Sequence, residues 1–180
     1  MRTVEILKKK INRYLMKEQL FKSQEYTKLE NPFLAKSRKN FTIANLFFRI
    51  SEQEELKKVL TLTHGFEMYE WVIIASYYAM YISALAAIAK LGFKSKSHAA
   101  TITVLENYYV CEKRRLEKKH IHQLSKAYAL SEGLINKLIE IKTRRETAQY
   151  DATPAISREN AITALEDAEE FITKIEEILV

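Results

Sequence analysis

The chain has 180 residues and a formal net charge of +6, a size that fits one domain with a core of its own. Only three glycines and two prolines are present, which argues against a turn-rich sheet protein and favours long helices. The single cysteine, Cys111, excludes an internal disulfide and is typical of a reducing compartment. Residues 1–17 carry charges throughout without an unbroken apolar run, so we expect no secretion signal and a cytoplasmic protein.

Apolar residues at helical spacing, separated by a few helix-breaking residues, predict a series of long helices. Asn31-Pro32 should end the first helix, Gly92 the third and Pro154 the fifth. Ser97 and Ser157 suit the N-cap position, and the Ser-Glu-Gly sequence at 131–133 is a place for a break or kink. The predicted helices span residues 3–29, 37–61, 66–92, 98–111, 122–150 and 158–180.

The third of these helices has two readings, because residues 71–89 carry no charge. Its length suits a membrane span, which needs about 20 apolar residues. Serines and tyrosines interrupt the run at mid-depth, however, and the tyrosines are not confined to its ends as in an aromatic belt. The other helices also need a partner to cover their apolar stripes. We therefore predict a buried central helix and no membrane partner.

The last helix has the clearest pattern in the chain. Its apolar residues are spaced four and three apart, with acidic residues on the outer face: Ala161, Leu165, Ala168, Ile172, Ile175 and Leu179. We find no internal repeat, no low-complexity tract and no strand alternation. The predicted architecture is an all-α, up-and-down helical bundle.

Charge is distributed unevenly along the chain. Residues 1–40 hold 11 Lys and Arg against 4 acids, and residues 111–145 hold 10 against 4. Residues 146–180 hold 2 against 9. The basic front and the acidic tail could neutralise each other, within one molecule or across a dimer, or remain solvated helix faces. The basic segments could equally meet an anionic partner such as RNA or nucleotide phosphate.

Standard catalytic signatures are missing from the sequence. The three glycines are isolated, so there is no phosphate-binding glycine loop. One cysteine and four dispersed histidines do not give the spacing of a zinc site, and no local signature of a serine or cysteine triad is present. We expect no metal and no cofactor.

Arg145 stands out because it continues the apolar stripe of Leu134, Leu138 and Ile141. A guanidinium at such a position needs an acceptor or a cleft, since an unpaired buried charge is costly. The structural reading is an ion pair with Glu70, Glu106 or a tail acid, or a shift of the stripe at the helix end. The functional reading is an arginine presented to phosphate, with Tyr150 and Asp151 beyond it. Asp151 could instead orient the arginine or end the helix.

Three blocks of the chain resemble the HEPN domain family: SYYAMYISALAAIAKLG (76–92), KSKSHAATITVLE (94–106) and RRETAQYD (144–151). They are most similar to the small stand-alone bacterial and archaeal members whose fourth helix ends in an arginine-to-tyrosine sequence. Order and spacing match, as does the amphipathic helix at the C-terminus. The resemblance covers roughly residues 37–180, so we treat these as a HEPN-like bundle and residues 1–36 as a basic helix that could pack on it.

The resemblance implies a bundle of four or five long helices that forms a homodimer. HEPN proteins are often encoded beside a minimal nucleotidyltransferase, and many are metal-independent endoribonucleases. In those enzymes an arginine and a histidine four to six residues later, one pair per subunit, meet across the dimer. The histidine can relay the proton of the 2′-hydroxyl while the arginine stabilises charge on the phosphorane, so no metal is needed.

This chain departs from that pattern at the histidine. Carrying the motif over to Arg145 puts Tyr150 at its position, and tyrosine, with an ordinary pKa near 10, is a poor base at neutral pH. A literal match occurs at Arg115 and His120, in a charged connection before the helix that should bear the motif. It is either a catalytic pair or a solvated or phosphate-contacting loop. His98 follows Ser97, where a helix N-terminus favours anions, and could contact phosphate or only cap the helix.

The resulting hypothesis is a nucleotide- or RNA-binding HEPN module, homodimeric, that works with a nucleotidyltransferase in a toxin–antitoxin or stress-response system. The first alternative is an active metal-independent endoribonuclease that uses Arg145 and Tyr150, with His98 or His120 as the base. The second is a structural dimer without a ligand. The residues expected to bind phosphate are Arg144, Arg145, Tyr150, Asp151 and His98.

Overall fold

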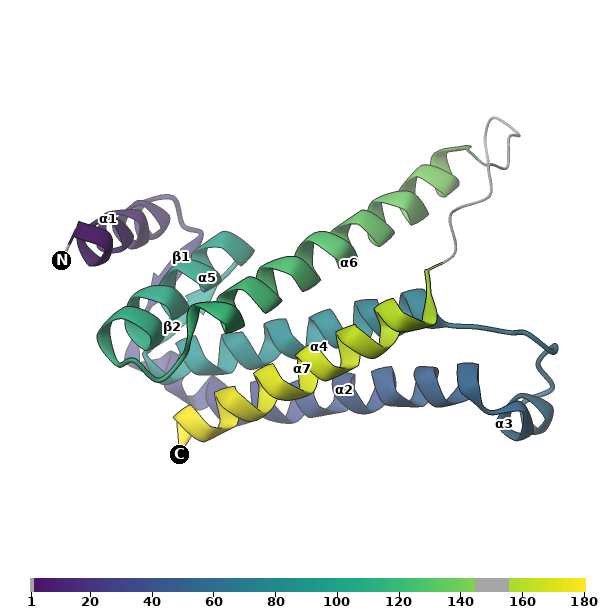
Figure 1. The fold of residues 1–180 in the computed structure, drawn as a ribbon. Coiled ribbons are helices and arrows are strands. Elements are labelled where there is room, and N and C mark those ends of the chain that lie inside the picture. The colour runs from purple at the N-terminus through teal and green to yellow at the C-terminus, as the bar shows by residue number, and fades with distance from the viewer. Residues whose placement is uncertain (1, 145–155) are drawn as a thin grey trace.

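The computed structural model describes the backbone of residues 2–144 and 156–180, and the side chains of residues 3–136 and 156–180. The chain forms the predicted all-α bundle (Figure 1). Helix α4 lies at its centre and packs against the three other longest helices. These helices are α2 (Glu30–Glu52), α4 (Tyr69–Lys90), α6 (Lys118–Arg144) and α7 (Arg158–Leu179).

Helix α4 is buried, as predicted. By length and composition it could cross a membrane, but 83% of its 18-residue apolar window is buried inside the molecule. Small side chains such as Ala79, Ala84 and Ala87 are fully buried and allow the neighbouring helices to approach closely. Two of the hydroxyl groups in this packing have partners: Ser37 on α2 donates a 2.7 Å hydrogen bond to the carbonyl of Ala79, and Ser83 donates to the carbonyl of Met80. The buried hydroxyl of Ser76 has none among the described residues.

The N-terminal segment differs from the prediction of one helix over residues 3–29. Helix α1 (Arg2–Met16) ends early, and strand β1 (Leu20–Lys22) and the short helix η1 (Gln24–Leu29) follow. Strand β1 pairs antiparallel with β2 (Phe93–Ser95), with Leu20 opposite Ser95 and Lys22 opposite Phe93. The Ser23 amide also donates to the Gly92 carbonyl at 2.9 Å. A partner far along the chain therefore overrides the local helical pattern.

The predicted break at Asn31-Pro32 is also wrong. Both residues lie in the first turn of α2. Proline is tolerated there, since the first amide groups of a helix have no partner within the helix. Helix α2 ends instead at Glu52, and a short helix, α3 (Glu54–Val59), follows.

The second half of the chain follows the predicted order. Ser97 caps α5 (His98–Leu105) and Ser157 caps α7, each by accepting a hydrogen bond from a backbone amide. After α5 the chain continues as the wider π-helix η2 (Glu106–Glu112), and α6 starts earlier than predicted and runs unbroken past Gly133. The apolar seam of α7 faces the core, where Ile172 and Ile175 are fully buried.

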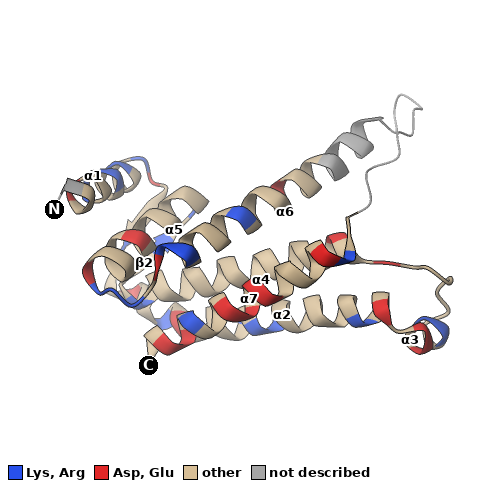
Figure 2. Cartoon of the chain, in the orientation of Figure 1, with Lys and Arg blue, Asp and Glu red and all other residues tan. Residues whose placement is uncertain are grey.

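Part of the acidic tail is neutralised within the molecule. Glu176 on α7 forms an ion pair with Arg38 on α2, in which the Nε–Oε1 distance is 2.7 Å. Glu170 on α7 pairs with Lys119 at the start of α6 at 2.8 Å. Figure 2 shows acidic residues along α7 and basic ones on α1 and at the start of α6.

Gly92 should be the glycine that tolerates substitution least. Its φ of +77° is unfavourable for other residues, and an added Cβ would meet the Ser23 carbonyl oxygen at 3.1 Å. We expect Gly92→Ala to destabilise the fold by about 1–2 kcal/mol or more. Gly65→Ala has the same backbone cost without the contact, so it should cost less. Gly133→Ala, in open space on α6, should stabilise by about 0.5–1 kcal/mol. Urea unfolding followed by circular dichroism measures the stability of all three variants. Equal losses of stability in Gly92→Ala and Gly65→Ala would contradict a close contact between residue 92 and the Ser23 carbonyl.

Candidate functional site

The arginine block predicted to bind phosphate begins where α6 ends. Arg144 is the last residue of that helix, at the end of the molecule opposite α1 (Figure 1). Arg145, Tyr150 and Asp151 lie outside the described residues, as does the Arg144 side chain. Both the phosphate-binding role and the alternative ion pair of Arg145 therefore stay predictions.

His98 lies in a cluster of tyrosines drawn from two other helices. Its ring stacks on Tyr128 of α6, with centroids 4.0 Å apart and planes 16° apart. Tyr81 and Tyr77 of α4 lie at 5.3 and 6.0 Å from the same ring. The cap at Ser97 starts α5 so that its first residue faces the seam between α4 and α6. Aromatic pairs in such contacts contribute about 0.5–1.5 kcal/mol beyond their area.

The electrostatics of this cluster favour an uncharged histidine. Both ring nitrogens of His98 are buried and have no hydrogen-bond partner among the described residues. Burial lowers the pKa of His98 to about 4. A neutral imidazole can exchange hydrogen bonds with a ligand, but it lacks the positive charge that attracts phosphate.

Tyr128 and Glu132 are members of this cluster that sequence reasoning missed. The Tyr128 hydroxyl donates a 2.6 Å hydrogen bond to the Glu132 carboxylate, and this bond raises the pKa of Tyr128. Their spacing of four residues on a helix was a readable signal that the two side chains interact. Their proximity to His98 depends on how α6 packs on α4, which the spacing does not reveal.

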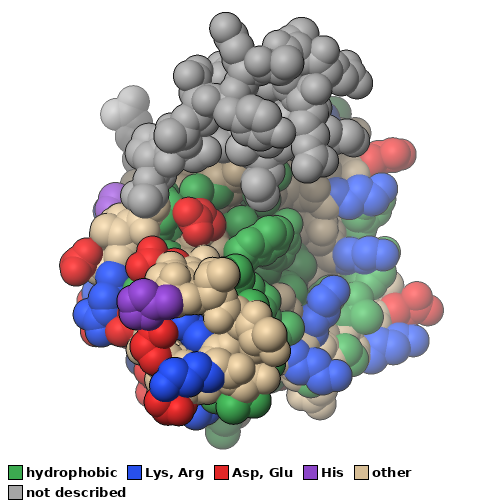
Figure 3. Space-filling view, turned by 90° about the vertical axis from the view of Figure 1, so that its right-hand side faces the viewer, with side chains coloured by type: hydrophobic (Ala, Val, Ile, Leu, Met, Phe, Trp, Pro, Cys, Tyr) green, Lys and Arg blue, Asp and Glu red, His purple; other side chains and the backbone are tan. Residues whose placement is uncertain are grey.

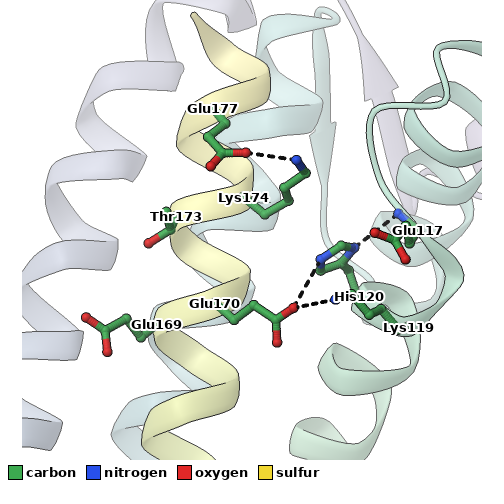
Figure 4. A pocket seen from close by; sticks show the side chains of 8 residues that line it. All are labelled: Glu117, Lys119, His120, Glu169, Glu170, Thr173, Lys174 and Glu177. Atoms are coloured by element: carbon green, nitrogen blue, oxygen red, sulfur yellow. Dashed lines mark hydrogen bonds and ion pairs between the residues drawn. The ribbon is translucent and has the colours of Figure 1, made fainter.

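The second histidine of interest, His120, lines a pocket of about 340 Å³ between the start of α6 and α7 (Figure 4). The ring is 2% exposed, and burial lowers the pKa of His120. Its Nδ1 accepts a 3.1 Å hydrogen bond from the Glu117 amide, so a neutral ring carries its proton on Nε2, 3.7 Å from Glu170. The lining residues are Glu117, Lys119, His120, Glu169, Glu170, Thr173, Lys174 and Glu177.

This pocket does not favour phosphate. Four carboxylates and two ammonium groups line it, so its field favours cations over anions. Lys119 already pairs with Glu170 and holds the pKa of that carboxyl below its ordinary value. Lys174 pairs with Glu177 at 2.8 Å. Among the residues that the structure describes, no group of three His, Cys, Asp or Glu side chains could hold a metal ion.

Arg115 and His120 do not converge on one reacting centre. The Arg115 guanidinium donates to the Ile178 carbonyl at 3.1 Å, near the C-terminus of α7. His120 faces Glu170, eight residues earlier on that helix. Eight residues correspond to about 12 Å along a helix. Although Arg115 and His120 have the spacing of the motif, Arg115 caps the C-terminus of α7 and His120 lies beside the Glu170 carboxylate.

Two comparisons place the chain among known proteins. A family model described as the HEPN domain matches residues 50–178. A UPF0332 protein of Archaeoglobus fulgidus is 29% identical over 130 residues, which are 72% of this chain and 90% of that relative. The matched segment contains His98, His120 and the block Arg144–Asp151, whereas α1, β1, η1 and most of α2 precede it.

The buried, neutral state of His98 predicts a pH dependence of stability. The folded-state pKa of about 4 is below the ordinary value of 6.5, so the unfolded chain binds the proton more tightly between these values. Stability should fall as pH drops from about 7 to 4, by up to about 3 kcal/mol from this group. His98→Phe keeps the stack and should make the dependence shallower by the share of His98, while the share of the buried His120 remains. Urea midpoints at several pH values measure it.

The control for this experiment is His122→Gln, because His122 is exposed on α6. It should leave the pH dependence of the wild type unchanged. If His98→Phe also leaves it unchanged, the imidazole is not held neutral in the tyrosine cluster.

Proposed function

This chain belongs to the HEPN domain family, and on that premise we propose that it is a nucleotide- or RNA-binding helical module that works as a homodimer. In the proposal the phosphates are bound by Arg144 and Arg145, with Tyr150 and Asp151 completing the site. The observation that carries it is the position of this block. It lies inside the segment that the family model matches, and its first residue, Arg144, is the last described residue of α6.

Two arginines in sequence suit phosphate chemically. A guanidinium stays protonated at any physiological pH and can give two parallel hydrogen bonds to phosphate oxygens. Tyr150 can donate a further hydrogen bond, or stack on a base. None of these roles requires proton transfer, so a tyrosine at the position of the family histidine is compatible with binding.

An active metal-independent endoribonuclease is the alternative within the same family. A nuclease site built from Arg115 and His120 is not supported by the geometry, because the two side chains face different parts of α7. His98 could act as the base only if the block after α6 reached the tyrosine cluster. The second alternative is a structural dimer whose arginines are held in ion pairs.

Exposed aromatic and aliphatic side chains support the homodimer. Trp71 is 49% and Tyr78 41% exposed on α4, and their spacing of seven residues puts them on one face of this otherwise buried helix. Val59 and Leu60 after α2 are also exposed. Figure 3, which looks onto the end of the bundle that carries α3, shows hydrophobic side chains at the surface there. Large aromatic residues are enriched in subunit interfaces.

The proposed partner is a minimal nucleotidyltransferase in a toxin–antitoxin or stress-response system. This part rests on the family resemblance alone. The chemistry is compatible with it, since such a partner works with nucleotides and this chain would offer cations for their phosphates.

The phosphate-binding role predicts a salt-dependent affinity for RNA that falls when the arginines are neutralised. Each phosphate contact to a single strand contributes about −0.7 to the slope of log K against log salt. Arg144→Gln/Arg145→Gln should therefore make the slope shallower by about 1 to 1.5. Fluorescence anisotropy with labelled single-stranded RNA measures it.

Lys58→Gln/Lys174→Gln is the matched control, because both lysines already pair with glutamates three residues away. It should leave the slope close to that of the wild type. An arginine variant that binds normally but melts at a lower temperature would support the structural dimer instead.

The ribonuclease alternative has its own test. Purified protein is incubated with end-labelled RNA in EDTA, beside Arg145→Ala and His120→Ala. We expect intact RNA in all samples. Cleavage by the wild type that disappears in a folded variant would make the protein a nuclease and identify the residue that carries the activity.

The homodimer predicts a change of mass in solution. Trp71→Glu/Tyr78→Glu should convert a dimer to a monomer, because two charges would be buried in an apolar interface. Ile43→Glu/Leu46→Glu on the exposed face of α2 should leave the dimer intact. Size-exclusion chromatography with light scattering measures both, and the reverse result would move the interface to α2.

A further inference from the structure

The small sheet carries a second cationic site, which we propose binds the phosphate backbone of single-stranded RNA. We define the lysine platform as Lys22, Lys94 and Lys96, together with the rings of Phe21, Tyr26 and Phe93. It lies at the opposite end of the molecule from the end of α6 (Figure 1). Half of it, β1 and η1, precedes the segment that the family model matches. The proposal thus goes beyond the proposed function, since it uses different residues, and of the two ligand classes named there it selects RNA.

The platform is held in place by backbone contacts from both sides. Strands β1 and β2 pair over three residues each. The Lys96 amide donates to the Gln19 carbonyl at 2.9 Å, and the Ser23 amide donates to the Gly92 carbonyl at 2.9 Å. Leu20 and Phe93 anchor the inner face of the sheet and are almost completely buried. By the strand register, Phe21 and Lys94 share the outer face, whereas Lys22 lies on the face of Phe93 and is exposed at the end of the sheet. The platform therefore reaches from the outer face around this end of the sheet, on a fixed backbone.

Each lysine of the platform lies over an aromatic ring. The Lys96 ammonium is 4.7 Å from the centre of the Phe21 ring, and the Lys22 ammonium is 5.0 Å from that of Phe93. Lys94 lies 5.8 Å from Tyr26. In such cation–π contacts the ammonium group is attracted to the negative face of the ring. They restrict three flexible side chains, so less conformational entropy is lost when a phosphate binds.

The three lysines also keep their charge available. None of them forms an ion pair with a described residue, whereas Lys8 and Lys119 are paired with Glu112 and Glu170. Residues 17–28 and 93–96 together hold five lysines and two glutamates, an excess of three positive charges. A surface with this excess attracts a polyanion over a distance of about a Debye length, about 8 Å in physiological salt.

The form of the platform favours RNA over a lipid surface. Peripheral membrane helices insert a continuous apolar face, but on α1, next to the sheet, Leu7 and Ile11 are buried in the core, and the exposed large hydrophobic residues, Ile6 and Met16, are ten residues apart. Phe21 and Tyr26 are half-buried beneath Lys96 and Lys94, so their rings hold the two ammonium groups at the surface. Lys94 is on β2 and Lys96 follows the strand directly, over the Phe21 ring that faces Lys94, and two residues of extended chain span about 7 Å. Such a row of cations fits a chain of phosphates better than a single nucleotide.

The experiment measures anisotropy of a labelled single-stranded RNA of about 20 nucleotides, in EDTA, over a range of salt concentrations. Lys22→Gln/Lys94→Gln/Lys96→Gln should make the log–log slope shallower by about 2, since each contact contributes about 0.7. Lys58→Gln/Lys126→Gln/Lys174→Gln removes the same charge elsewhere and should bind like the wild type. Lys22→Arg/Lys94→Arg/Lys96→Arg should restore the wild-type slope. Thermal melting checks that each variant is folded.

Three outcomes would overturn the platform. The first is an unchanged slope in the platform variant, and the second is an equal loss in the charge-matched control, which would reflect net charge alone. In the third, vesicles containing phosphatidylserine bind in a platform-dependent manner while RNA does not.

Arg144→Gln/Arg145→Gln, titrated in parallel, separates this proposal from the proposed function. If only the arginine variant weakens binding, the platform proposal fails and the phosphate site after α6 stands. If only the platform variant does, the reverse holds. A wild-type protein that binds no RNA overturns the platform, whereas arginine-dependent binding of a mononucleotide would still support the proposed function.

Discussion

The burial of α4 is the constraint on which the rest of the structure depends. A helix without a charge from residue 71 to 89 must be covered, and burying each large aliphatic side chain contributes about 1.5–3 kcal/mol. Its alanines bring α2 close enough for Ser37 to reach the Ala79 carbonyl. Helix α4 is apolar enough to cross a membrane, but its apolar segment is largely enclosed by the neighbouring helices. It therefore forms the core of the bundle.

The covering of α4 also creates the polar features near it. Tyr77 and Tyr81 sit on this apolar helix, and α5 and α6 close over them with His98 and Tyr128. A histidine in that position loses its hydration, and its pKa falls accordingly. The tyrosine cluster is therefore a consequence of packing α5 and α6 on α4. Any ligand in this cluster would have to be bound by groups other than a charged imidazole.

Sequence reasoning predicted the features that depend on nearby residues. The uncharged run of α4, the seam of α7 and the caps at Ser97 and Ser157 are each encoded within one or two helical turns. The sheet was missed because strands of three residues carry little alternation and because Leu20 pairs with Ser95 far along the chain. The role of Pro32 was predicted wrongly because a proline that follows the end of one helix and a proline in the first turn of the next give the same local sequence signal. For the candidate site, the positions of His98 and Arg115 were known, but their neighbours come from other helices.

The pairing of charges also depends on contacts between residues far apart in the sequence. The sequence shows a basic front and an acidic tail, but the fold decides which charges neutralise each other. Helix α7 offers Glu170 and Glu176 to Lys119 and Arg38, so those cations are held within the bundle. The lysines of the sheet lie over aromatic rings instead, which orient an ammonium group without cancelling its charge. A cation that is ordered but not neutralised retains its attraction for an anion, and this distinguishes the sheet from the pocket beside His120.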